Sequence, residues 1–342
     1  MNITFLFGNG FDLQLGMKTR YSHFYNYYKK LPTPENKPAI KELKDKLSDD
    51  DNNWSDFELE FGNYCKEFIS IEDFETVFDD VSTELAKYIS QKQNRFNFDV
   101  DFALSIIQCL GSPEKFLQRA DREKIEGFKK NWANHSPWYT NLITFNYSTS
   151  LENLLKKINL SNNISVQGVQ KQLKINPVIH IHGTTSEYMV LGVNEISQIS
   201  NTKLRENPYV ISALVKPECN KAMKHLIERD CESIIDNSNL ICLFGTSIGD
   251  TDKIWWETIG AWVKKPYTQL IIFSKGEKEI PALKRYKIIR EEDYIRSYFL
   301  SKTKLNEDEK VRISDKIIIG YDTNIFDFQL DEKETNLSEI QG

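Results

Sequence analysis

Four short apolar segments of the chain are each followed at once by glycines or polar residues that could bind a ligand or act in catalysis. These residues are Gly8, Asn9, Gly10, Phe11 and Asp12; Asn146; His182 and Gly183; and Gly245, Thr246, Ser247, Asp250 and Asp252. Glycines let a backbone approach a phosphate, an asparagine can hold a sugar hydroxyl or a water, and a histidine can exchange a proton near neutral pH. Their recurrence at four places indicates a ligand site more strongly than any one motif does.

The apolar segments predict the strands that must position these residues. Segments 2–7, 142–145, 178–181 and 240–244 are short and apolar, as is 270–273, and stretches with helical spacing lie between them. Strands that alternate with helices imply an α/β fold, with a Rossmann-like parallel sheet and helices on both faces. Ligands of such sheets bind outside the carboxyl ends of the strands, which is where the residues above are expected.

The glycine turn after the first predicted strand has two interpretations. A strand that runs into glycines and then a helix is typical of nucleotide-binding units. However, the spacing of Gly8, Gly10 and Gly16 departs from the dinucleotide fingerprint, and a tight strand-to-helix turn would also explain the glycines. Asn146 also has two interpretations, because it could hold a ligand or cap the helix predicted after it. Ser148 could serve as that cap instead.

His180 and His182 are two residues apart, so on a strand they would share one face. They could then be two metal ligands, or one general base beside a structural neighbour. His182 stands against Gly183 at the predicted strand end, and we expect it to be the one that faces a ligand. Asp252 could accept from a ribose hydroxyl or cap the tryptophan-containing helix that follows it.

A separate group of Trp54, Asp56 and Glu58 lies far from the predicted strands. On a helix, residues 54 and 58 share a face and Asp56 points elsewhere. The two carboxylates could serve acid–base or metal chemistry. The alternative is the solvated start of an acidic helix.

Segment 31–135 is expected to form a mainly helical lobe inserted into the α/β core. Its apolar residues recur three or four apart, as an amphipathic helix requires. We therefore expect residues 1–30 and 136–290 to form the nucleotide-binding core. Residues 291–342 are expected to be a C-terminal extension that ends in an acidic tail.

Composition limits the class of protein. The 342 residues are 40% hydrophobic, which suffices for a sizeable core, and the net charge of -6 argues against binding along a nucleic-acid backbone. No apolar run approaches the ~18 residues of a membrane span. The five cysteines include no CxxC pair, which favours free thiols and a cytoplasmic location.

Taken in order, the motifs resemble those of the bacteriophage abortive infection AbiH family. The motifs are Gly8–Leu13, Trp54–Glu58, Phe145–Ser148, His180–Gly183 and Gly245–Asp252. They extend over most of the chain, and as an ordered set they are specific. The resemblance implies a role in defence against phages, in which a phage-derived trigger acts on the protein.

The layout also resembles, more distantly, the sirtuin-like NAD-binding fold of prokaryotic defence proteins. This resemblance implies that Gly8 and Gly10 belong to the dinucleotide loop and that segment 245–247 contacts the dinucleotide. It further implies that Asn146 lies at the nicotinamide–ribose bond and that His182 is the catalytic histidine. The four-cysteine zinc module of protein deacylases is missing from the sequence, so deacylation of acetyl-lysine is not expected.

Three functions follow as hypotheses. The first is an NAD glycohydrolase that halts the infected cell; NAD is its substrate, and no prosthetic group or resident metal is expected. In it, Asn146 positions a water or the ribose, His182 accepts a proton, and Asp12 orients the base or the ribose. The second is a metal-dependent hydrolase of nucleotides or nucleic acid. The third is a non-enzymatic nucleotide-binding sensor, and we expect a homo-oligomer without a membrane partner.

Overall fold

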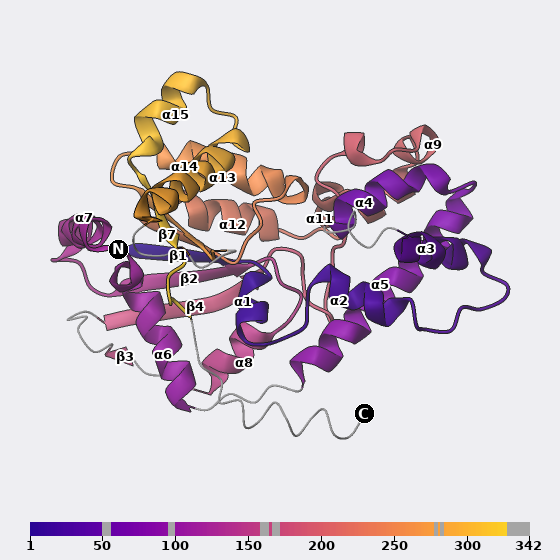
Figure 1. Ribbon diagram of the computed structural model, residues 1–342, viewed down its shortest axis with the longest axis horizontal. Coiled ribbons are helices and arrows are strands. Elements are labelled where there is room, and N and C mark those ends of the chain that lie inside the picture. The colour runs from indigo at the N-terminus through magenta and orange to yellow at the C-terminus, as the bar shows by residue number, and fades with distance from the viewer. Residues whose placement is uncertain are drawn as a thin grey trace.

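The computed structural model describes residues 1–49, 56–94, 100–157, 164–165, 172–276, 280 and 284–326. Within these residues, one seven-stranded sheet has the order β3-β4-β2-β1-β5-β6-β7 (Figure 1). The strands are β1 Asn2–Phe7, β2 Trp138–Thr144, β3 Ile164–Ser165, β4 Gln172–His180, β5 Leu240–Phe244, β6 Gln269–Ser274 and β7 Ile317–Tyr321. All neighbours pair in parallel except β3, which is antiparallel to β4. The α/β class and the predicted parallel sheet are confirmed, whereas the sirtuin-like part stays a prediction.

The strand order places a crevice at one point of the sheet. If the six parallel strands are numbered along the chain, their order is 3-2-1-4-5-6, the order of dinucleotide-binding sheets. The central strand β1 pairs with β2 on one side and with β5 on the other. The connections after β1 and β5 therefore leave in opposite directions, and a ligand site is expected between their carboxyl ends.

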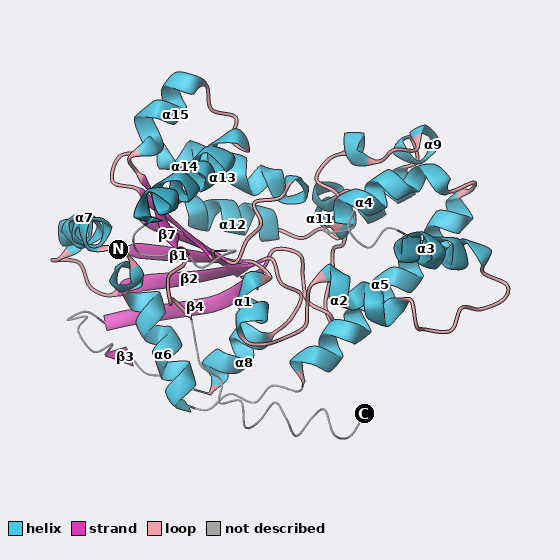
Figure 2. Ribbon diagram, in the orientation of Figure 1, coloured by secondary structure: helices cyan, strands magenta, loops and turns pink. Residues whose placement is uncertain are grey.

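Helices cover both faces of the sheet and build a second body beside it (Figure 2). The helices are α1 Gly10–Gln14, α2 Tyr21–Tyr28, α3 Pro38–Asp49, α4 Phe57–Tyr64, α5 Ile71–Gln93, α6 Val100–Gly111, α7 Arg119–Lys129, α8 Ser150–Lys156, α9 Thr202–Arg205, α10 Pro208–Leu214, α11 Lys216–Ala222, α12 Ile227–Asp236, α13 Lys253–Val263, α14 Arg285–Ser301 and α15 Glu307–Ser314. One core joins α6 and α8 to the sheet, through residues such as Ile106 and Leu154. The core on the opposite face includes Trp256 from α13 and Phe299 from α14.

The second body is a helical lobe with an aromatic core. Phe24, Phe57, Phe61 and Phe74 from α2, α4 and α5 are almost fully buried there, and the segment around Leu191 packs with them. Helix α5 buries an apolar side chain at nearly every turn, as its sequence spacing predicts. Ser70 and Asp73 form a capping box that fixes where α5 begins.

The cores of the structure combine parts of the chain that the predicted segments had separated. The predicted domain boundaries themselves stay a prediction. Helices α6 and α7 of segment 31–135 pack against the sheet, and residues 189–215 pack in the helical lobe. Strand β7, from the predicted C-terminal extension, completes the sheet beside β6. Trp54 and the acidic tail from Asp331 lie outside the described residues. No helix in the described part of the chain is long and apolar enough to cross a membrane.

Candidate functional site

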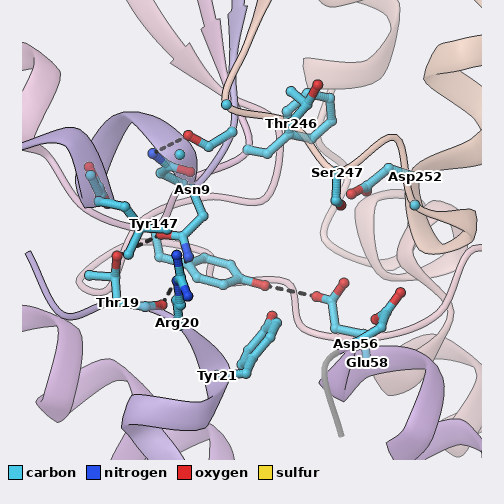
Figure 3. Close-up of a pocket in the computed structure, with 18 of the residues that line it drawn as sticks. Asn9, Thr19, Arg20, Tyr21, Asp56, Glu58, Tyr147, Thr246, Ser247 and Asp252 are labelled. Carbon is cyan, nitrogen blue, oxygen red and sulfur yellow. Dashed lines mark hydrogen bonds between the residues drawn. The ribbon is translucent and has the colours of Figure 1, made fainter. Parts of the chain in front are cut away.

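A cleft of about 830 Å³ opens where the sheet meets the helical lobe, at the carboxyl ends of β1, β2, β4 and β5. Ten of the thirteen predicted site residues line it: Gly8, Asn9, Gly10, Asp12, Asn146, His182, Gly245, Thr246, Ser247 and Asp252. The helical lobe adds residues from α2, α4 and α5. Figure 3 shows Asn9, Thr19 and Arg20 on one side of the cleft and Asp56, Glu58 and Asp252 on the other. The sheet edge therefore brings the predicted groups together, as expected.

The other three predicted residues, Phe11, Gly183 and Asp250, do not line the cleft. Phe11 is 1% exposed and packs in the core against the ring of Phe7. Asp250 accepts a hydrogen bond at 2.7 Å from Lys302. Gly183 has a φ of +70°, and a Cβ there would collide with the backbone of Tyr188. Backbone geometry or packing therefore explains each of these residues without a ligand.

Glycines occur in both strand-end loops because the loops touch each other. The N–H of Gly10 donates to the carbonyl of Gly245 at 2.8 Å. A Cβ on Gly8 or on Gly10 would overlap the backbone of Gly245, which itself has a φ of +68°. The contact between loops thus requires all three glycines, whether or not a phosphate also approaches them.

Asn9 holds the start of α2 over the cleft. Its side-chain amide donates to the carbonyl of Thr19 at 3.1 Å, and the Thr19 hydroxyl donates back to Asn9 Oδ1 at 2.6 Å. The adjoining Arg20 and Tyr21 line the cleft, with Arg20 exposed. The loop from β1 thereby positions a cation at the mouth of the cleft.

Asp12 is a buried carboxylate with hydroxyl partners. It is 2% exposed and accepts hydrogen bonds at 2.6 Å from each of Ser148 and Ser150. Burial raises the pKa of Asp12, and the two hydroxyls oppose that rise. Nearby, the Asn146 amide donates to the carbonyl of Gly8 at 3.1 Å, while the N-cap of α8 is Thr149. Asn146 is therefore not the cap of that helix.

Lys216 links both bodies of the molecule through a buried cluster of charges. Its ammonium donates to Glu58 Oε2 at 2.7 Å and to Asp252 Oδ1 at 2.9 Å. His182 Nε2 lies 2.8 Å from the same Asp252 oxygen and 3.4 Å from the ammonium. Glu58 belongs to α4 of the helical lobe, whereas His182 and Asp252 follow strands of the sheet. The cluster therefore fixes the lobe against the strand ends.

The charges of this cluster control its protonation. Burial alone would lower the pKa of Lys216, but Asp252 and Glu58 outweigh burial and raise it. Burial would likewise raise the pKa of Asp252, but Lys216 and His182 outweigh it and hold that pKa well below its usual range. Asp252 is therefore a carboxylate at neutral pH.

Tyr147 extends the cluster on the lobe side. Its hydroxyl lies 3.1 Å from Glu58 Oε1 and 2.9 Å from the carbonyl of Val190. Burial raises the pKa of Tyr147, and the negative charge of Glu58 adds to the rise. Tyr147 thus remains a neutral phenol that holds Glu58 in place.

Asp56 is a carboxyl group of the cleft with a pKa raised toward neutrality. It is the N-cap of α4, where its Oδ1 accepts from the N–H of Leu59 at 3.2 Å. Burial, followed by the charge of Glu58, raises the pKa of Asp56 to about 6. Asp56 and Glu58 both line the cleft, so the question left open by the sequence is answered for these two residues.

The prediction that His180 and His182 share one face is wrong. Strand β4 ends at His180, and the chain turns at residues 181–182, so the alternation of a strand does not continue. His180 contacts Glu152 of α8 and the carbonyl of Asn146, whereas His182 contacts Asp252. The two rings therefore have separate partners. In the described ranges, no group of three His, Cys, Asp or Glu residues is placed to hold a metal ion.

Sequence reasoning did not identify Lys216, Tyr147 or Arg20 as individual site residues. Lys216 begins α11, where the N–H of Lys216 donates to the carbonyl of Val193 at 2.9 Å. It follows no predicted strand and belongs to no motif, so nothing in the sequence marked it. Tyr147 did fall within the quoted motif Phe145–Ser148, and that position was the signal available for it.

Comparison with known proteins identifies the family of the chain. No curated protein matches the sequence. A family model does match it, over residues 4–274, a range that contains each strand end of the cleft. The model is that of bacteriophage abortive infection AbiH, and the chain therefore belongs to the AbiH family, which indicates an anti-phage role in abortive infection.

Proposed function

We propose that the cleft binds an NAD-type dinucleotide and hydrolyses its bond between nicotinamide and ribose. The strand order and the position of the cleft between β1 and β5 support a dinucleotide. A volume of about 830 Å³ also lies in the range of cofactor-sized sites. Depletion of NAD would halt an infected cell, which fits the abortive-infection role of the family.

The observation that carries the proposal is the excess of negative charge in one wall of the cleft. Asp56, Glu58 and Asp252 lie in this wall, and among the described residues Lys216 is the lysine that pairs with the last two. The nicotinamide ring of NAD is cationic, and it leaves as a neutral molecule when its bond to ribose breaks. Positive charge then develops on the ribose, and preorganised carboxylates stabilise such a transition state.

The remaining chemistry needs a water and a base. The water oxygen bonds to the anomeric carbon, the pair of electrons of the broken bond leaves with nicotinamide, and one proton of the water passes to a base. Asp56 suits this role because it lines the cleft with a pKa of about 6. His182 suits it less, because Asp252 occupies its Nε2. In this proposal Asn146 orients the water or the ribose, His182 orients Asp252, and Asp12 supports the loop.

A product assay tests the proposal. Purified wild-type protein is incubated with NAD, and nicotinamide and ADP-ribose are measured by chromatography. We expect release that Asp56→Asn and Asn146→Ala abolish and that EDTA leaves unchanged. Asp250→Asn is the matched control, since Asp250 lies in the strand-end loop of Asp252 but pairs with Lys302.

Measurement of NAD in phage-infected cells completes the test, since a phage-derived trigger can be absent from a purified preparation. A fall in NAD that Asp56→Asn prevents supports the proposal. Stable NAD during successful defence overturns it. In that case, activity on nucleotides that EDTA removes would indicate the metal-dependent hydrolase, and nucleotide binding without turnover would indicate the sensor.

A further inference from the structure

A second, much smaller cavity also borders His182. It has a volume of about 10 Å³, which is close to the room that one water molecule needs. Polar side chains among its lining residues include Asn220 of α11 and Glu228 of α12, beside Lys216 and Asp252. His182 lines this small cavity and the substrate cleft, so its ring lies between the two.

One nitrogen of His182 lacks a partner in the described part of the protein. The residue is 4% exposed, its Nε2 is held by Asp252, and its Nδ1 is buried without a hydrogen bond. Because Asp252 is a carboxylate, it accepts the proton of Nε2, which leaves Nδ1 as the basic nitrogen of the neutral ring. A buried nitrogen of this kind costs free energy unless a water satisfies it.

Glu228 lines the small cavity and is partly exposed to the solvent. It is half-buried in the first turn of α12, and its Oε1 accepts from the Asn220 amide at 2.9 Å. Burial raises the pKa of Glu228, and the nearby His182 opposes that rise. The other charges that act on Glu228 are Glu232 of its own helix and Glu218 of α11, while those next to His182 are Asp252 and Lys216.

We propose that one water molecule occupies the small cavity, hydrogen-bonds to His182 Nδ1 and joins it to Glu228. Glu228 is then a positioning residue that acts on His182 from behind the cleft. As the Glu228 carboxyl gives a proton to the water, the water gives one to Nδ1, so one proton moves and the water is regenerated uncharged. His182 can thereby exchange protons with the solvent while a substrate fills the cleft.

The water itself is tested by a high-resolution crystal structure of the full chain. We expect density for one ordered water within hydrogen-bond distance of Nδ1. A dry cavity overturns the proposal. The role of this relay in catalysis rests on the proposed NAD hydrolysis. Neither result of the crystallographic test depends on that activity, so failure of the relay and failure of the proposed function can be distinguished.

The link to Glu228 is tested by a pH titration of the His182 ring with NMR. Glu228→Gln keeps the hydrogen bond to Asn220 but removes the carboxylate that attracts an imidazolium. We expect the midpoint of the His182 signals to fall by at least ~0.3 pH units in this variant, a roughly twofold change in proton affinity. Glu232→Gln, an exposed neighbour one turn along α12 that does not line the small cavity, is the control and should change the midpoint less than Glu228→Gln does. Equal midpoints in wild type and Glu228→Gln overturn the link.

Discussion

Two buried lysine–carboxylate clusters among the described residues differ in charge balance, one at the cleft and one beside the sheet. Lys129 of α7 faces one carboxylate, with both oxygens of Glu114 at 2.8 and 2.9 Å and the carbonyl of Gly111 at 3.2 Å. Lys216 faces two carboxylates, Glu58 and Asp252, and these line a cleft. The first cluster is balanced and closed. The second carries surplus negative charge against an open space, which suits the binding of a cation more than stability.

Loss of either lysine should produce the largest effects on stability. Lys216→Met and Lys129→Met each leave a buried carboxylate without its cation, and we expect each to lower the free energy of unfolding by about 3–5 kcal/mol. Urea unfolding measures this. The two variants should differ in activity: folded Lys129→Met should hydrolyse NAD as wild type does, and folded Lys216→Met should not. Equal activity per folded molecule would remove the distinction between the clusters.

Asp56→Asn tests whether the cleft beside the Lys216 cluster is catalytic. Asparagine can still cap α4, so we expect little loss of stability, but loss of the base should reduce the rate of NAD hydrolysis by about 10²-fold or more. Because the pKa of Asp56 is about 6 and its carboxylate is the active form, wild-type activity should fall as pH drops through 6. A pH–rate profile that keeps this acid limb in the variant would contradict the assignment.

The pH dependence of stability should separate cation-paired from hydroxyl-paired aspartates. The lowered pKa of Asp252 means that its contribution to stability is present above ~4, the usual pKa of an aspartate, and is lost as pH falls below it. Asp252→Asn should therefore cost about 2–3 kcal/mol near pH 6 and less at pH 3. The pKa of Asp12 is raised, so its linkage has the opposite sign. For Asp12→Asn, the stability of wild type relative to the variant should improve as pH falls.

Thr19→Val tests the cleft at its rim, where the smallest effect is expected. The substitution removes the hydrogen bond to Asn9 and loosens the turn that carries Arg20. A bond of this kind contributes about 1 kcal/mol, which corresponds to a rise of roughly fivefold in KM for NAD. Steady-state kinetics with kcat unchanged would fit this role. An unchanged KM would show that Arg20 takes no part in binding.

The sequence predicts the strands that position the site better than it predicts the charged residues within it. Runs such as 2–7 and 240–244 are apolar enough to predict buried parallel strands, and strand ends meet at one sheet edge by topology. Strand β7 is not among the predicted strands, although residues 317–319 are all isoleucine, because the segment belongs to the predicted C-terminal extension. Lys216 could not have been predicted, since its partners lie 158 and 36 residues away in sequence. Only the folded chain brings them together.

The central position of β1 has a consequence for synthesis of the protein. One neighbour of β1 is β5, and Asp252 follows β5, so the cleft joins residues near the start of the chain to residues about 240 positions later. A nascent chain still on the ribosome at residue 230 has neither the second glycine loop nor Asp252, one of the two carboxylate partners of Lys216. Any activity of this cleft is therefore absent from incomplete chains. A bacterium that carries such a protein would be exposed to it only after translation has passed the last segment of the site.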